Sequence, residues 1–194
     1  MKTLNPKPLH RRGALIMAAL STVVALALNG CKSNPTGVDN DDKNNGNDDT
    51  PRTAVPAELV GAWHHGSVSS INFYNPTTGS WANGYGEGLF YKFNSDGTFE
   101  YGWQVYANSY GCSSRALVYK KGTVTVDPAT STIQVYVTMA RVHGEDSCAP
   151  SSNCDRPVPL INETLIWEFG KDEYGNTVLW LRFPDTGFSD FYRQ

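Results

Sequence analysis

The feature that most constrains this chain is the placement of an apolar residue at every second position through much of its C-terminal two-thirds. Phe99, Tyr101, Trp103 and Val105 alternate with polar or small residues, and the segments 133–139 and 165–169 repeat the pattern. Successive side chains of a β-strand point to opposite faces, so this spacing predicts strands that are apolar on one face. Apart from a turn near Pro56–Leu59, no stretch after the N-terminal region has helical spacing. The sequence therefore predicts an all-β domain.

Turn sequences separate the apolar runs. Asn94-Ser95-Asp96-Gly97, Asp127-Pro128-Ala129-Thr130 and Tyr174-Gly175-Asn176 are rich in turn-forming residues. They divide the chain into expected strands near 58–65, 68–74, 88–93, 98–107, 116–126, 131–142, 163–171, 177–184 and 187–193. Short connections favour an antiparallel meander, which removes its edges by closing into an up-and-down β-barrel of about eight strands. A two-sheet sandwich is the alternative.

Three cysteines lie in this domain, and three thiols permit one disulfide. Cys148 and Cys154 flank a short polar loop and form one candidate pair. Cys112 offers a second candidate. A two-residue turn at Pro128-Ala129 pairs Val118 with Met139 and, extended along the hairpin, places Cys112 opposite Glu145 and near Cys148. Both pairings stay open on the sequence.

The N-terminus has the composition of an export signal. Residues 1–12 carry four basic residues and no acidic ones, and residues 13–28 are apolar and uncharged. The apolar run is shorter than the roughly 20 residues that a membrane-spanning helix needs. A retained membrane helix is the alternative.

The signal ends in Leu28-Asn29-Gly30-Cys31, which resembles the bacterial lipobox. The resemblance implies that residues 1–30 are removed as a lipoprotein signal peptide and that Cys31 carries the lipid. Several acyl chains would hold the protein stably on a membrane of the cell envelope. Lys32 replaces the Asp that favours inner-membrane retention in Gram-negative lipoproteins, which implies the outer membrane in a cell of that type.

Residues 31–54 are rich in Asn and Asp, and Val38 is their only strongly apolar side chain. This composition predicts a disordered acidic linker that forms no core. No register of the run supplies the ligands of an EF-hand calcium loop. Residues 54–194 carry nine basic and fourteen acidic residues, a net charge of −5, which argues against nucleic acid as a partner.

Two motifs indicate a family for the remaining domain. Glu58-Leu59-Val60-Gly61-Ala62-Trp63 resembles the Gly-x-Trp opening of the lipocalin-like (calycin) barrels. The segment 91–101 is similar to the aromatic-turn-Gly-Thr-aromatic hairpin of small bacterial lipocalin-like domains. The resemblance implies a lipocalin-like β-barrel over residues 55–194. It also implies that Trp63 closes one barrel end beneath a basic side chain from a late strand, for which Arg182 and Arg193 are the candidates.

The sequence contains no motif of a known catalytic or nucleotide-binding site. His64 and His65 point to opposite faces of one strand and cannot ligate one ion from the same side. His143, Glu145, Asp146 and Cys148 form a denser group, interpreted as a polar loop rather than a zinc site. The expectation is therefore no catalysis, no cofactor and no metal.

An eight-stranded barrel either is filled by side chains or holds one small ligand. Bulky residues expected inside, with Arg141 near a strand end, make up the candidate ligand site: Tyr101, Trp103, Met139, Arg141 and Trp167. The leading hypothesis is an envelope lipoprotein that binds a small apolar or amphipathic molecule. The alternative is a module that binds an envelope protein or glycan through loops 75–88, 107–115 and 143–162, with the aromatics Trp81, Tyr85 and Tyr110.

Overall fold

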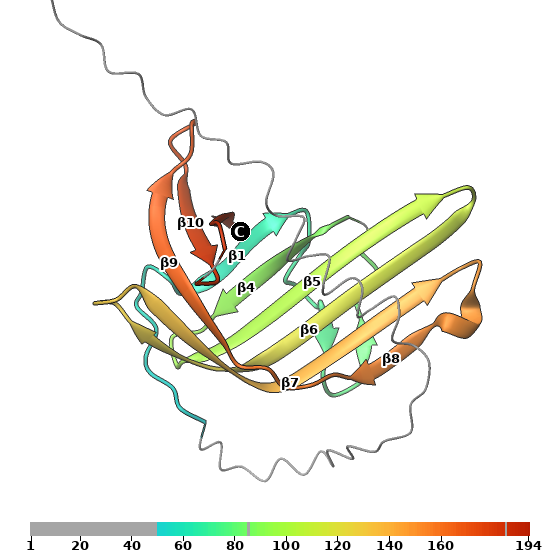
Figure 1. The fold of residues 1–194 in the computed structure, drawn as a ribbon, viewed down its shortest axis with the longest axis horizontal. Helices are drawn as coiled ribbons and strands as arrows, with labels where there is room; N and C mark the ends of the chain where they lie inside the picture. Colours follow the sequence, from blue (N-terminus) through green and yellow to red (C-terminus); the bar gives the residue numbers. More distant parts are fainter. Residues whose placement is uncertain (1–49, 85, 185) are drawn as a thin grey trace, which may run out of the picture.

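The computed structural model of the protein describes residues 50–194, except positions 85 and 185 (Figure 1). The predicted signal peptide, Cys31, most of the linker and Tyr85 lie outside the described residues. Residues 51–55, which the sequence assigns to the end of the linker and the start of the domain, lie along the sheet. There the Thr53 amide donates to the Val124 carbonyl at 3.0 Å, and the Thr123 hydroxyl donates to the Pro51 carbonyl at 2.9 Å.

The described chain is all-β apart from a 3₁₀ turn, η1 (Pro150–Ser152). Its strands are β1 (Gly61–Gly66), β2 (Tyr74–Asn75), β3 (Ser80–Trp81), β4 (Gly88–Phe93), β5 (Thr98–Ser109), β6 (Cys112–Asp127), β7 (Thr132–Asp146), β8 (Cys154–Pro157), β9 (Glu163–Lys171), β10 (Thr177–Arg182) and β11 (Ser189–Arg193). Nine of them form one antiparallel sheet in the order β6-β5-β4-β1-β11-β10-β9-β7-β8, and β6 also pairs with β7. The hydrogen bonds therefore run in a ring through eight strands, with β8 added outside it.

The interior of the ring is filled by the protein's own side chains. Trp63, Phe93 and Phe99 are each about 1% exposed. They pack with aliphatic residues from the other strands, including Leu59, Val124, Ile133, Val135, Leu165, Leu179 and Leu181. Burial of this apolar surface supplies the main stabilisation of the fold.

One end of the ring is closed by Trp63 and Arg193. The Trp63 indole donates to the Leu59 carbonyl at 2.8 Å, and the Arg193 guanidinium lies 4.8 Å from the centre of the indole ring. Arg193 also donates to the carbonyls of Glu58 and Val60, at 2.9 and 2.7 Å. Of the two arginines considered for this position, Arg193 occupies it. Arg182 instead lies over the Phe188 ring and donates to the Pro184 carbonyl.

Strands β5, β6 and β7 extend past the ring and, with β8, form a lobe (Figure 1). The lobe comprises 105–109, 112–117, 142–146 and 154–157. The expectation of a loop at 107–115 is wrong, because β5 and β6 pair up to Ser109 and Cys112. Tyr110 and Gly111, at φ 52° and 82°, form the two-residue turn between them.

The expected strand at 68–74 is also wrong, since only Tyr74 and Asn75 are in a strand, and that strand pairs with β3. The segment 67–84 instead covers the outer face of the sheet. Phe73 packs edge-on against Phe90 at 5.3 Å, and Val68, Tyr74, Leu117 and Tyr119 complete a second buried cluster. Gly102 makes room for the Phe90 ring, because a Cβ there would lie 2.2 Å from Phe90 Cε1.

A β-bulge in β7 decides which side chains face the interior. Lys121 pairs with Met139 but Gly122 pairs with Val137, so Thr138 is an extra residue without a partner across the ladder. Before the bulge Ile133, Val135 and Val137 point inward, and after it Ala140 does. One extra residue therefore reverses the face of the sheet to which each later side chain of β7 points.

The bulge needs a glycine opposite it. A Cβ on Gly122 would lie 2.0 Å from the Tyr136 carbonyl oxygen, so we expect Gly122→Ala to lower the free energy of unfolding by about 1–3 kcal/mol through overpacking. Urea unfolding followed by tryptophan fluorescence measures this change. Gly187→Ala is the control, because its Cβ would meet nothing within 4 Å. Equal stabilities for the two variants would contradict this account of the bulge.

Candidate functional site

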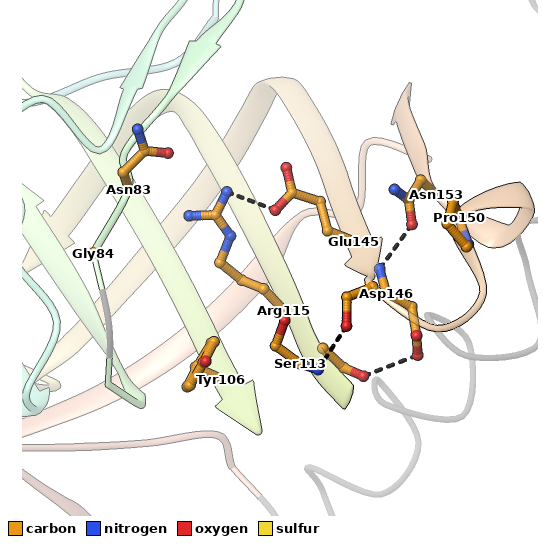
Figure 2. A pocket seen from close by; sticks show the side chains of 11 residues that line it. Asn83, Gly84, Tyr106, Ser113, Arg115, Glu145, Asp146, Pro150 and Asn153 are labelled. Atoms are coloured by element: carbon orange, nitrogen blue, oxygen red, sulfur yellow. Dashed lines mark hydrogen bonds and ion pairs between the residues drawn. The ribbon is translucent and has the colours of Figure 1, made fainter. Parts of the chain in front are cut away.

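A polar hollow of about 520 Å³ lies on the lobe, outside the ring. It opens where the covering segment 67–84 ends. Figure 2 shows side chains reaching it from the covering segment, from β5 and β6, and from the end of β7 with η1. The lining residues are Asn83, Gly84, Tyr106, Ser113, Ser114, Arg115, Glu145, Asp146, Ser147, Pro150 and Asn153.

Arg115 ties together the parts that surround the hollow. One guanidinium nitrogen donates to the Ala82 carbonyl and the other to Glu145 Oε2, both at 2.9 Å. The Arg115 side chain is 13% exposed, and the Glu145 side chain is 45% exposed. Arg115 therefore holds the end of the covering segment against β6 and β7, while its charge is compensated by Glu145.

The Arg115–Glu145 pair belongs to a longer network on the outer face. His143 Nε2 lies 2.8 Å from Glu145 Oε1, and its Nδ1 lies 3.6 Å from Asp155 Oδ2. Asp155 also pairs with Arg141 at 2.6 Å and accepts from the Trp81 indole at 2.8 Å. The Trp81 ring stacks on His143 with 5.5 Å between centres. The network therefore joins the covering segment to β7 and β8.

These contacts lower the pKa of both carboxyl groups. The hydrogen bond with His143, followed by the charge of Arg115, holds the pKa of Glu145 below its ordinary value of 4.5. Burial acts to raise the pKa of Asp155. The hydrogen bonds from Arg141 and Trp81 outweigh burial, so that pKa lies below 3.8. Both groups are ionised at neutral pH.

Asp146 organises the turn at the edge of the hollow. Its carboxylate accepts from the Ser114 hydroxyl at 2.9 Å and from the amides of Cys148 and Ala149 at 2.8 and 3.0 Å. The same hydrogen bonds, that of Ser114 first, lower the pKa of Asp146. These bonds occupy both carboxylate oxygens.

A disulfide between Cys112 and Cys148 joins the start of β6 to this turn, with Cα atoms 5.5 Å apart. The Cys148–Cys154 alternative is not formed. The expected register is wrong, because Val118 faces Val142 rather than Met139. Four residues, rather than two, connect β6 to β7, and the bulge adds another shift. The ladder then continues through Ser113 and Ser147 and brings Cys112 opposite Cys148. The expected register instead places Cys112 opposite Glu145.

The structure separates the five residues of the predicted ligand site. Tyr101 and Trp167 pack against the interior cluster, and Trp103 is buried in β5. Met139 packs with the outer cluster, and Arg141 belongs to the outer polar network. The expectation that Met139 and Arg141 share the inward face is wrong, since both follow the bulge at Thr138.

A second hollow, of about 310 Å³, lies between the end of β1 and the chain's C-terminus. Its lining residues are His64, Gly66, Ser67, Val68, Ser69, Tyr192, Arg193 and Gln194. The His64 Nδ1 hydrogen-bonds the Val68 carbonyl at 2.8 Å and thereby helps to hold the covering segment. Both hollows therefore lie outside the ring.

Within residues 50–194, positions 85 and 185 aside, no three His, Cys, Asp or Glu side chains are grouped to hold a metal ion. In the same part of the chain, no helix has the length and apolar character needed to cross a membrane. Comparison with protein-family models, with curated proteins and with solved structures gives no match. The chemistry of the hollow is therefore inferred from its geometry alone.

Replacing Glu145 tests the network through its pH dependence. A carboxyl group whose pKa is lowered by folding stabilises the protein above its unfolded pKa and loses that contribution as the pH falls through the folded pKa. We expect Glu145→Gln to cost under about 1 kcal/mol at neutral pH, since the pair is partly exposed. The variant should also lose less stability than the parent between pH 5 and about pH 3. Urea unfolding across this range measures both effects.

Glu173→Gln, in the exposed turn after β9, is the control. An acid response of Glu145→Gln that matches the parent would contradict the assigned role of Glu145.

Proposed function

We propose that this protein is a lipid-anchored bacterial envelope protein that binds an envelope macromolecule through the polar hollow on its lobe. In this proposal the domain is a lipocalin-like up-and-down barrel that serves as a scaffold and carries out no catalysis. The position of the hollow carries the proposal, because it lies on an extension of three strands beyond the ring, whereas large side chains fill the interior. In many β-proteins a rigid sheet is the scaffold, and the binding site lies on segments that project from one end of it.

The anchor and the tether are the second part of the proposal. The lipobox-like sequence ending at Cys31 supports lipidation, and the acidic Asn/Asp-rich run after it supports a flexible spacer. Such a spacer would let the domain reach partners near an envelope membrane, and the outer membrane is proposed for a Gram-negative cell. No nucleic acid is expected as a partner, because the domain is acidic.

A second candidate function is the binding of a small amphipathic molecule at the end of the ring where partly exposed side chains border the packed core. Lys120 and Glu163 form an ion pair there, and the Lys120 ammonium lies 5.3 Å from the centre of the Tyr101 ring. Burial, with the charge of Glu163, raises the pKa of Tyr101. The Trp167 indole N–H is buried without a hydrogen-bond partner among the described residues. A small molecule that remains with the full chain in native mass spectrometry would favour this candidate.

The anchor is tested by Cys31→Ser. We expect this variant to lose incorporation of radiolabelled palmitate and to retain an unprocessed signal peptide, because the serine cannot form the thioether on which lipoprotein processing depends. Gel mobility and labelling of the parent and variant chains measure this. Ser33→Ala, a small change two residues after Cys31, is the control, and equal labelling of Cys31→Ser and the parent would contradict the proposal.

The role of the hollow is tested by photocrosslinking in cells. A benzoylphenylalanine at Ser113, inside the hollow, should form a discrete crosslinked product with an envelope macromolecule. The same residue at Glu173, in the exposed turn between β9 and β10, should not form that product. Crosslinks of equal yield and pattern from both positions would count against the hollow as the binding site.

A further inference from the structure

We infer that the hollow on the lobe binds a neutral, hydroxyl-rich saccharide. This inference rests on the proposed function, since it assigns a chemical class to the partner of the same site. The chemistry of the lining decides between a saccharide, an ionic ligand and an apolar ligand.

The charged groups that line the hollow are already compensated within the protein. Arg115 pairs with Glu145 at 2.9 Å and also donates to the Ala82 carbonyl. The carboxylate of Asp146 accepts three hydrogen bonds from the Ser114 hydroxyl and two backbone amides. An ionic ligand would have to compete with these partners, so its contacts would replace existing ones rather than add to them. The hollow therefore disfavours a phosphate, a sulfate or a charged peptide.

The groups that remain available are neutral. The side chains of Asn83 and Ser113 have no hydrogen bond among the described residues. Asn153 uses its Oδ1 to accept from the Asp146 amide at 2.7 Å, which leaves its Nδ2 to donate. The Ser147 hydroxyl oxygen accepts from the Ser113 amide and keeps its own hydrogen for another acceptor. Amides and hydroxyls that both donate and accept match sugar hydroxyls, which also do both.

One aromatic ring completes the site. Tyr106 lies in the same row across the strands as Arg115 and Glu145, and its side chain lines the hollow (Figure 2). Tyr106 therefore borders the space that the neutral amides and hydroxyls of the lining surround. The volume of about 520 Å³ lies within the roughly 300–1,000 Å³ of typical small-ligand sites. Most of the lining side chains carry polar groups, which a ligand would satisfy best with polar groups of its own.

The experiment uses the full chain and trisaccharide probes of opposite kinds. Isothermal titration with the neutral probes chitotriose, maltotriose and cellotriose should detect binding of at least one of them. A sulfated heparin trisaccharide should show no measurable binding in the same titration. Binding of the neutral probe should change little from about 0.1 M to about 1 M salt, because no ion pair forms with the ligand.

Matched variants locate the binding. Asn83→Ala and Ser113→Ala should each weaken binding of the neutral probe about fivefold through the lost hydrogen bonds. Tyr110→Ala, at the exposed hairpin tip, and Asn108→Ala, on the same strand but outside the hollow, should leave the affinity unchanged. Thermal unfolding of each variant shows whether a loss of affinity reflects a loss of fold.

The outcomes separate the saccharide inference from the proposed function. Salt-sensitive binding of the sulfated probe alone would overturn the inference. A crosslinked product at Ser113 that consists of protein, together with no saccharide binding, would also overturn it but would leave the proposed function standing. The absence of both a hollow-specific crosslink and saccharide binding would overturn the two together.

Discussion

The single extra residue at Thr138 is the constraint on which the rest of this structure depends. It lies in the middle of the longest strand pairing, between β6 and β7. On one side of it β7 directs its odd-numbered residues into the ring, and on the other side it directs them outward. The bulge is possible because Gly122 lets the Tyr136 carbonyl approach closely. One backbone irregularity thus divides β7 into a half that faces the core and a half whose polar side chains line the outer face.

The outward half of β7 then organises two layers of structure. Arg141, His143 and Glu145 project in succession and bind the covering segment through Trp81 and, by way of Arg115, through the Ala82 carbonyl. The covering segment ends beyond the last of these contacts, and the hollow lies next to its end. The same register brings Cys112 opposite Cys148, so the disulfide fixes the end of the lobe. The network and the disulfide together hold the hollow between them.

Local signals in the sequence predict most of the fold, because neighbouring residues determine where strands and turns form. The alternation around Phe99–Val105 and the Asp96-Gly97 turn are confirmed, with Asp96 accepting hydrogen bonds from Thr98. The bulge and the true hairpin register depend on packing across strands, which alternation alone does not encode. For that reason alternation places Met139 and Arg141 on the wrong face, and it gives no sign of the hollow, which five separate segments build. The sequence groups His143 with Glu145 but does not point to their partners Arg115 and Asp155.

The pairing of the first and last ring strands has a consequence for how the chain is made. β1 gains its second neighbour from β11, the last strand of the described chain, and Arg193 of β11 lies over the Trp63 ring. During synthesis, β1 and the strands that follow it cannot close the ring until β11 has been made. Until then β1 keeps an unpaired edge open to other chains. A chain cut short before β11 would therefore keep its other strand pairings and yet be unable to close the ring.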